Sequence, residues 1–145
     1  MFVGEILCGT ILYQAGKDVY DIKCGNGVVG DYVKVVQNNN YLTLAEVQSF
    51  GVAAPNVGGN HPLIKASGFT ASQSSTGFGG VPSRAIDGNT SGKYSDDSCS
   101  HSGGNKNNWW MVNFNKAYKI YSVKIFNRND CCQDRIDGAN VSLMI

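Results

Sequence analysis

The residues most able to do chemistry are a histidine and two arginines in the last third of the chain. His101 is followed by 26 residues, then by Arg128-Asn129-Asp130, four more residues and Arg135. A guanidinium only donates hydrogen bonds, whereas a neutral imidazole donates at one nitrogen and accepts at the other. Such a set suits a small, uncharged, oxygen-rich ligand. The pattern therefore predicts a carbohydrate-binding site.

A second stretch concentrates side-chain oxygens over about a dozen positions: Asp87, Asn89, Ser95, Asp96, Asp97 and Ser98. One interpretation is a series of Asx and Ser turns that satisfy their own backbone. The other is a calcium site, because Ca²⁺ takes six to eight oxygen ligands. The spacing is not that of an EF-hand, and the composition leaves both interpretations open.

The five cysteines carry no CxxC pair or His-rich cluster, which disfavours a structural zinc site. Disulfides formed in an oxidising compartment are the better interpretation, and the odd count leaves one thiol over. Cys8 and Cys24 lie at the two ends of a predicted hairpin-like unit, where a disulfide is geometrically natural. The others are Cys99, Cys131 and Cys132.

Length and charge limit the classes of function. With 145 residues the chain can form one domain with a full core, and a net charge of +1 does not favour nucleic acid or an acidic membrane surface. No stretch approaches 18 apolar residues, so no membrane-spanning segment is expected. Residues 1–16 lack a basic start and are interrupted by Glu5, so we interpret them as mature chain.

Several short strands must position these residues. Strands are predicted over 1–14, 18–24, 31–37, 41–51, 109–114 and 118–126. Residues 51–68 are predicted to form a connection containing a solvated His61, and residues 69–98 are loop-rich. Without a strong amphipathic helix, the pattern predicts an all-β, antiparallel, jelly-roll-like β-sandwich.

The pattern also predicts part of the core. Leu42, Leu44 and Val47 are expected on one face of their strand, and Ile120, Val123 and Ile125 on one face of another. Trp109 and Trp110 are adjacent, so in a strand they point to opposite faces and one of them is expected in the core.

The segment from Cys99 to Arg135 resembles the F-type lectins, a family of fucose-binding lectins. Their signature is a histidine, 26 residues, Arg-x-Asp, four residues and Arg or Lys, and it is present here without a gap. Further similar stretches are AIDGN (85–89), SCSH (98–101), WW (109–110), NRNDCC (127–132) and DGA (137–139). The resemblance implies a discoidin-like jelly roll that binds terminal α-L-fucose through loops at one end.

The resemblance also implies roles for particular residues. His101, Arg128 and Arg135 would hydrogen-bond the hydroxyls and ring oxygen of the sugar. A Cys131–Cys132 disulfide would form a wall against its flank, and Tyr94 would touch the C6 methyl group. Asp130 would orient the arginines from behind.

A structural Ca²⁺ is implied as well. Its ligands would be the side chains of Glu46, Asp87, Asn89 and Ser98, together with the backbone carbonyls of Arg84 and Ala45. The ion would stiffen the loop that carries His101 without touching the sugar.

One position departs from the family pattern. The family usually has a cysteine where this chain has Ala45, bonded to the counterpart of Cys99. Cys99 is therefore expected to be a free, buried thiol. The missing disulfide would cost stability and loosen the join between Glu46 and the His101 loop.

The order of the segments departs from the family too. Residues 65–145 resemble the half that comes first in the family, and residues 1–50 resemble the half that closes it, with 51–64 as a bridging linker. We interpret 1–145 as a single, circularly permuted domain. A fragment cut across two tandem repeats is the alternative.

Three classes of function compete. The first is a secreted or cell-surface lectin whose partners are fucosylated glycans, without nucleic-acid binding or membrane insertion. The second is a discoidin-like module that binds lipid or protein through exposed hydrophobic loop residues. The third is a fucosidase, which would need two suitably spaced carboxylates. Asp130, Asp134 and Asp137 do not form a legible pair, so an enzyme is not expected.

Overall fold

The protein is all-β in the computed structural model, which describes residues 4–54, 61–65 and 68–144. Its strands form one hydrogen-bonded antiparallel sheet in the order β1-β7-β2-β6-β3-β5, with β4 paired to β6. The strands are β1 (Ile6–Thr10), β2 (Val19–Gln37), β3 (Thr43–Ala53), β4 (Thr70–Gln73), β5 (Ser100–His101), β6 (Asn108–Asn127) and β7 (Asn140–Met144). The helical elements of the described residues are three short 3₁₀ turns, η1 (Pro82–Ile86), η2 (Tyr94–Asp96) and η3 (Gln133–Ile136), and none could cross a membrane.

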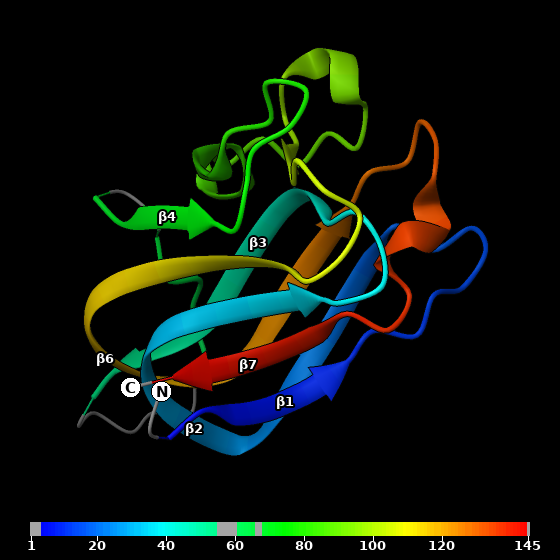
Figure 1. Ribbon diagram of the computed structural model, residues 1–145. Helices are drawn as coiled ribbons and strands as arrows, with labels where there is room; N and C mark the ends of the chain where they lie inside the picture. Colours follow the sequence, from blue (N-terminus) through cyan, green and yellow to red (C-terminus); the bar gives the residue numbers. More distant parts are fainter. Residues whose placement is uncertain (1–3, 55–60, 66–67, 145) are drawn as a thin grey trace.

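Strands β2 and β6 form a long ribbon that folds the sheet over. They pair from Val19 opposite Phe126 to Gln37 opposite Asn108. Both strands curve strongly midway (Figure 1), so the first half of β2 and the second half of β6 lie in one layer and the remaining halves in the other. Strand β3 extends the first layer, and β7, β1 and β4 extend the second. The sheet thereby closes into the predicted antiparallel sandwich.

Glycines allow β2 to bend without ending. The register shifts between Lys23 and Val28, where Gly25 and Gly27 have φ angles of 61° and 98°. Residues with a Cβ rarely adopt this left-handed backbone, and an extra residue at such a point increases the local bend. The predicted strands 18–24 and 31–37 are for this reason parts of a single strand. Predicted strands 109–114 and 118–126 are likewise joined in β6.

The predicted N-terminal hairpin is wrong. The described part of residues 1–14 contains only the short β1, which pairs with β7 rather than with β2, for example Ile6 with Leu143. The Cys8–Cys24 disulfide joins β1 to β2 across this arrangement. Local sequence favours a strand there but carries no information about its partner, which is here more than 130 residues away.

The predicted linker 51–64 lies partly in the sheet. Residues 51–53 complete β3, and residues 62–64 run back beside it, with the Ile64 N–H donating to Ser49 O at 2.8 Å. Residues 55–60 of that linker lie outside the described residues.

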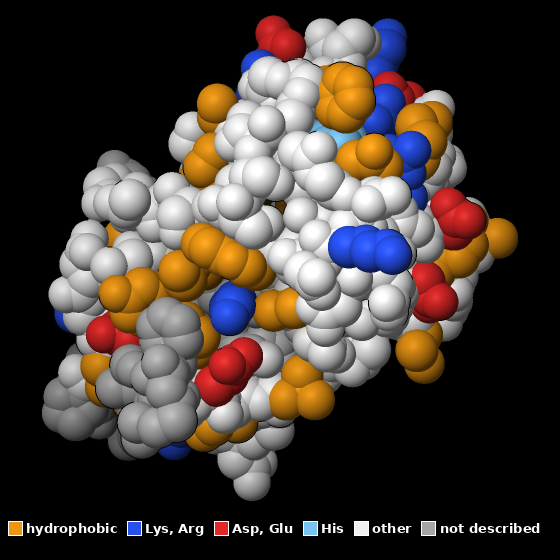
Figure 2. Space-filling view, viewed as in Figure 1, with side chains coloured by type: hydrophobic (Ala, Val, Ile, Leu, Met, Phe, Trp, Pro, Cys, Tyr) orange, Lys and Arg blue, Asp and Glu red, His pale blue; other side chains and the backbone are white. Residues whose placement is uncertain are grey.

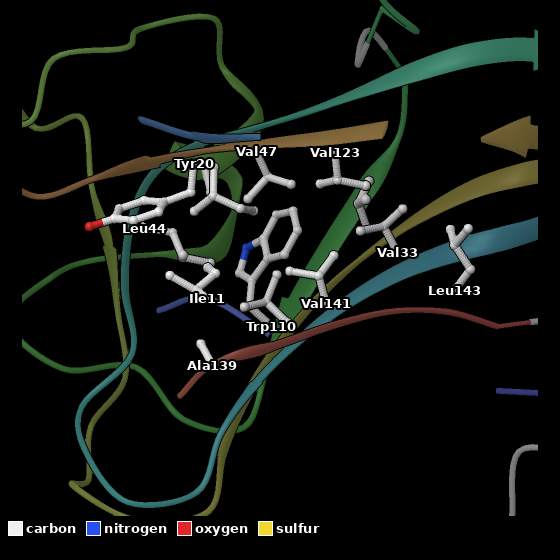
Figure 3. Packing of buried hydrophobic residues seen from close by; sticks show 14 of the residues in the cluster. Ile11, Tyr20, Val33, Leu44, Val47, Trp110, Val123, Ala139, Val141 and Leu143 are labelled. Carbon is white, nitrogen blue, oxygen red and sulfur yellow. The ribbon is translucent and has the colours of Figure 1, made fainter. Parts of the chain in front are cut away.

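Trp110 occupies the centre of the core (Figure 3). Its side chain is fully buried between the layers, near Val123, Val141 and Leu44, and its Nε1–H donates to Pro82 O at 3.0 Å. The six core residues predicted from strand periodicity are all buried, as is one of the two tryptophans. In β3 the alternation of buried and exposed residues fails, because Ala45 and Glu46 are buried as well. Glu46 is one of the expected metal ligands.

Most of the connecting loops lie at one end of the sandwich. In Figure 1 the loops between β4 and β6 lie at the top, and the turn after β6 and the turn between β1 and β2 lie at the right, whereas the start of β1 and the end of β7 lie together at the lower left.

The tryptophan pair offers a matched test of the packing. Trp110→Phe removes a buried hydrogen bond and leaves a cavity, so we expect a loss of about 2–3 kcal/mol in the free energy of unfolding. Trp109→Phe alters a partly exposed side chain and should cost less than about 1 kcal/mol. Urea unfolding followed by circular dichroism measures both, and equal losses would contradict this description of the core.

Candidate functional site

His101 is held in a fixed position by its backbone. It lies in β5 opposite Thr43, its N–H donates to Gly80 O at 2.9 Å, and its carbonyl accepts from Gly77 N–H at 3.0 Å. The residue is 2% exposed. Because its backbone is fixed, the side chain of His101 has little freedom to move. A binding site requires side chains that are held in this way.

The hydrogen bond at Nδ1 defines the tautomer of His101. Nδ1 lies 2.6 Å from Ser102 O, and because a carbonyl only accepts, Nδ1 carries the proton. Burial lowers the pKa of His101, and the nearby charges of Arg128 and Arg135 lower it further. The ring is therefore neutral at pH 7, and Nε2 is a hydrogen-bond acceptor.

Arg128 follows β6 directly and is oriented by Asp130. Its Nε–H donates to Asp130 Oδ1 at 2.5 Å, and its guanidinium lies 4.6 Å from the centre of the Tyr94 ring. The other oxygen of Asp130 accepts from the Tyr94 N–H at 3.1 Å. The hydrogen bond from Arg128 lowers the pKa of Asp130, which stays ionised and balances the arginine. Because the ion pair uses Nε, the terminal nitrogens of Arg128 are available to a ligand.

Arg135 approaches from the turn η3. Its guanidinium lies 4.8 Å from the centre of the Tyr41 ring, and the Tyr41 ring in turn packs 5.4 Å from that of His101. The disulfide between Cys131 and Cys132 comes immediately before η3. Cys132 has a left-handed backbone, with φ 60°, and begins the turn. The cysteine pair and Arg135 are thus parts of one compact element.

These residues surround a hollow of about 260 Å³. At this end of the molecule basic, hydrophobic and histidine side chains gather on the surface (Figure 2). Six of the seven residues expected to bind sugar line the hollow, and the seventh, Asp130, lies behind Arg128. The lining consists of Phe78, Tyr94, His101, Arg128, Cys131, Cys132 and Arg135.

Phe78 is a lining residue that the sequence reasoning missed. It is 75% exposed, and its ring meets His101 edge-on at 4.9 Å. The Tyr94 hydroxyl holds the Phe78 carbonyl at 2.9 Å. A Cβ at Gly80 would lie within 2.7 Å of His101 and Tyr94, so the loop packs closely only with glycine there. An aromatic residue within the run Gly77-Phe78-Gly79-Gly80 was the available signal.

Two of the expected calcium ligands, Glu46 and Asp87, line a separate hollow of about 300 Å³. Glu46 Oε2 accepts from Gly88 N–H at 2.8 Å, whereas Oε1, although buried, has no hydrogen-bond partner among the described residues. Burial raises the pKa of Glu46 to about 8, and the neighbouring charge of Asp87 adds to this rise.

Of the remaining expected ligands, Arg84, Asn89 and Ser98 lie between β4 and β5, and Ala45 lies in β3. Asn89 Oδ1 accepts from Ser91 N–H at 3.0 Å, and the Ser98 hydroxyl donates to Ser91 O at 2.5 Å. The side chain of Arg84 faces Asp97 at 3.6 Å, and Ala45 is buried. Within the described part of the chain, no three His, Cys, Asp or Glu side chains form a metal-binding group. Two carboxylates, one with a buried unpaired oxygen, beside neutral oxygens nevertheless fit a hard cation.

Cys99 and His61 are the remaining candidates from the sequence. Cys99 is a free, buried thiol, and burial raises its pKa. His61 is an exposed loop residue, as predicted, and its ring stacks on Tyr121 with the centroids 3.6 Å apart.

Comparison with known proteins places residues 84–144 in a family model described as NedA-like, galactose-binding domain, of the F5/F8 type C kind. The fucolectin of Anguilla anguilla is 48% identical over 61 residues, which are 42% of this chain and 39% of the relative. Fucolectin-5 of Anguilla japonica is 45% identical over 76 residues, 49% of this chain and 40% of the relative. A pentraxin fusion protein of Xenopus laevis is 35% identical over 60 residues, 41% of this chain and 14% of that protein.

The fold is all-β, and residues 84–144 match a family model of the F5/F8 type C kind. The similarity to the fucolectins supports an F-type lectin domain in this chain. The chain spans about two fifths of the length of the fucolectins it matches, and their names describe them as lectins.

Proposed function

We propose that the chain is a carbohydrate-binding lectin that recognises terminal α-L-fucose in the hollow around His101. The observation that carries the proposal is the composition of this hollow: one neutral imidazole acceptor, two guanidinium donors and an apolar wall in a space of about 260 Å³. The relatives named fucolectins support fucose as the sugar.

The donor and acceptor pattern suits a neutral polyol. His101 Nε2 accepts from a sugar hydroxyl, while Arg128 and Arg135 donate to hydroxyl and ring oxygens, which can accept. Asp130 balances Arg128, whereas Arg135 has no ion pair among the described residues. The donors of both guanidiniums can be satisfied by the oxygens of an uncharged sugar.

The apolar wall suits a deoxy sugar. L-Fucose carries a methyl group at C6, and Phe78, Tyr94 and the Cys131–Cys132 disulfide give such a group apolar surface. Tyr94 also stacks on Arg128 and holds Phe78, so it links the polar and apolar sides. We propose Tyr94 and Phe78 together as the methyl-binding surface.

The two other classes of function are less well supported. A lipid-binding module needs several exposed apolar loop residues, and the loops at this end expose Phe78, Leu12 and Val81, of which Phe78 adjoins the buried His101. A glycosidase needs a second carboxylate facing the ligand, but the hollow is lined by none among the described residues, and Asp130 is engaged by Arg128 and Tyr94.

Loss of a guanidinium or of the imidazole tests the sugar site. Arg128→Ala should weaken L-fucose binding by about 10–100-fold, because a hydrogen bond to a charged group contributes about 1.5–3 kcal/mol. His101→Ala removes a neutral acceptor and leaves a sugar hydroxyl unsatisfied, which costs about 1–3 kcal/mol and should weaken binding by about 5–100-fold. Isothermal titration calorimetry with L-fucose measures this, with circular dichroism to establish that the fold is retained.

Lys124→Ala is the matched control, since Lys124 is a cation over the Phe50 ring, away from the hollow. It should keep the affinity of the unaltered protein. Unchanged affinity in both site variants would end the proposal, and binding of anionic vesicles without fucose binding would favour the lipid-binding class.

We also propose a structural Ca²⁺ held by Glu46, Asp87, Asn89 and Ser98 and by the carbonyls of Arg84 and Ala45. The unpaired Oε1 of Glu46 supports it. A bound cation would supply the positive charge that balances the buried carboxylate of Glu46. It would tie β3 to the loop that leads through Ser98 into His101.

Calcium addition should raise the melting temperature by several degrees, and chelation should reverse the rise, because a ligand that binds only the folded state stabilises it. Glu46→Gln should abolish this response, whereas Asp21→Asn, an exposed carboxylate elsewhere, should retain it. The same melting temperature with calcium and with chelator would contradict the proposal.

The disulfides support an extracellular location for this lectin, since such bonds persist in oxidising compartments. The proposed partners are accordingly fucosylated glycans.

The single, circularly permuted domain stays a proposal. It is supported by β1 and β7, which pair antiparallel with Ile6 opposite Leu143, so a short turn between residues 145 and 1 would make them a hairpin. The proposed family order would then read 65–145 followed by 1–64.

A chain rebuilt in that order should fold with a similar melting temperature and the same fucose affinity, because it keeps every contact of the sheet. Calorimetry and size-exclusion chromatography check both. A rebuilt chain that fails to fold, or an original chain that forms only dimers of paired halves, would favour the tandem-repeat alternative.

A further inference from the structure

A buried glutamine at the end of β2 is part of neither the sugar hollow nor the hydrophobic core. Gln37 is the last residue of β2 and is 1% exposed. Burying an amide without partners is costly, so its contacts indicate what the residue does there.

Both hydrogens of its amide are used on one turn. Gln37 Nε2 donates to Arg135 O at 2.8 Å and to Asp137 O at 2.8 Å. Its Oε1 accepts from Asn39 N–H at 3.3 Å. The side chain is thereby satisfied at every polar position.

These bonds hold the far end of η3. A helical turn leaves its last carbonyls without intrahelical partners, and here a side chain 98 residues away supplies one of them. The near end of η3 is held by the Arg135 N–H, which donates to Cys132 O at 3.1 Å. Arg135 therefore lies between the cysteine pair and Gln37.

A turn of four residues has little stability of its own. Its buried residue, Ile136, anchors it to the core. The bonds from Gln37 to the carbonyls of residues 135 and 137 fix the rotation of the backbone at this point, and so the direction in which the guanidinium leaves toward Tyr41 and the hollow.

We propose that Gln37 is a positioning residue of the sugar site, which acts through the backbone of η3 to aim Arg135. The inference rests on the proposed function for its effect on binding. Its effect on Arg135 itself does not depend on the identity of the ligand.

Gln37→Met keeps the size and burial of the side chain and removes both donors. L-Fucose binding should weaken by about tenfold, the equivalent of one lost hydrogen bond at the site. Trp110→Phe is the control for general destabilisation, since it lowers stability in the core and should change the affinity of the folded protein by less than about twofold.

A second readout separates positioning from stability. The chain has three arginines, Arg84, Arg128 and Arg135, so their side-chain Nε–H signals can be assigned in a nitrogen-15 NMR spectrum by single substitution. In Gln37→Met the Arg135 signal should shift while the Arg128 signal stays. Should this variant fail to fold, Gln37→Asn, whose amide is too short to reach η3, takes its place with the same expectations.

Wild-type affinity in the Gln37 variant, or a loss equal to that of Trp110→Phe with an unmoved Arg135 signal, would overturn the inference. Absence of fucose binding by the unaltered protein would instead overturn the proposed function, and the Arg135 signal would still decide the role of Gln37.

Discussion

The site depends on the folding-over of the β2–β6 ribbon. Because two paired strands of about twenty residues bend together, the end with Gln37 and Asn108 comes to the same edge of the sandwich as the end with Asp18 and Asn127. Arg128 leaves one end of this ribbon, and Gln37 at the other end holds the turn that carries Arg135. The turn that carries Arg135 is thus held by the end of the ribbon opposite to the one that Arg128 leaves.

Amide side chains join the core to the loops at that edge. Asn127 donates to Gln133 O at 3.0 Å, Asn108 to the carbonyls of Asn40 and Gly104, and Gln73 to those of Gly80 and His101. An amide supplies two donors from one short side chain, so it can hold irregular backbone where no strand pairs with it. The abundant Asn and Gln therefore stabilise loop positions as well as forming turns.

Features that follow from local sequence patterns could be predicted, whereas contacts between segments distant in the chain could not. The type and spacing of His101, Arg128 and Arg135 were enough to predict that these three residues share a site, and the resemblance to the F-type lectins added Tyr94, Cys131 and Cys132. Strand periodicity was enough to predict core residues such as Ile120. Phe78 and Gln37 were missed because their role arises only when segments distant in the chain meet. The pairing of β1 with β7 was missed because a short apolar strand does not specify its partner, and the continuity of β2 because glycines that permit a bend also resemble a turn.

The central claim is that His101, Arg128 and Arg135 hold a neutral sugar against the Cys131–Cys132 wall. A crystal structure of the protein with α-L-fucose tests it most directly. The sugar is expected in the hollow, with a hydroxyl within hydrogen-bond distance of His101 Nε2. Both guanidiniums should donate to its oxygens, and its C6 methyl group should contact Phe78 and Tyr94. Fucose bound elsewhere, or a hollow that stays empty at saturating fucose, would contradict it.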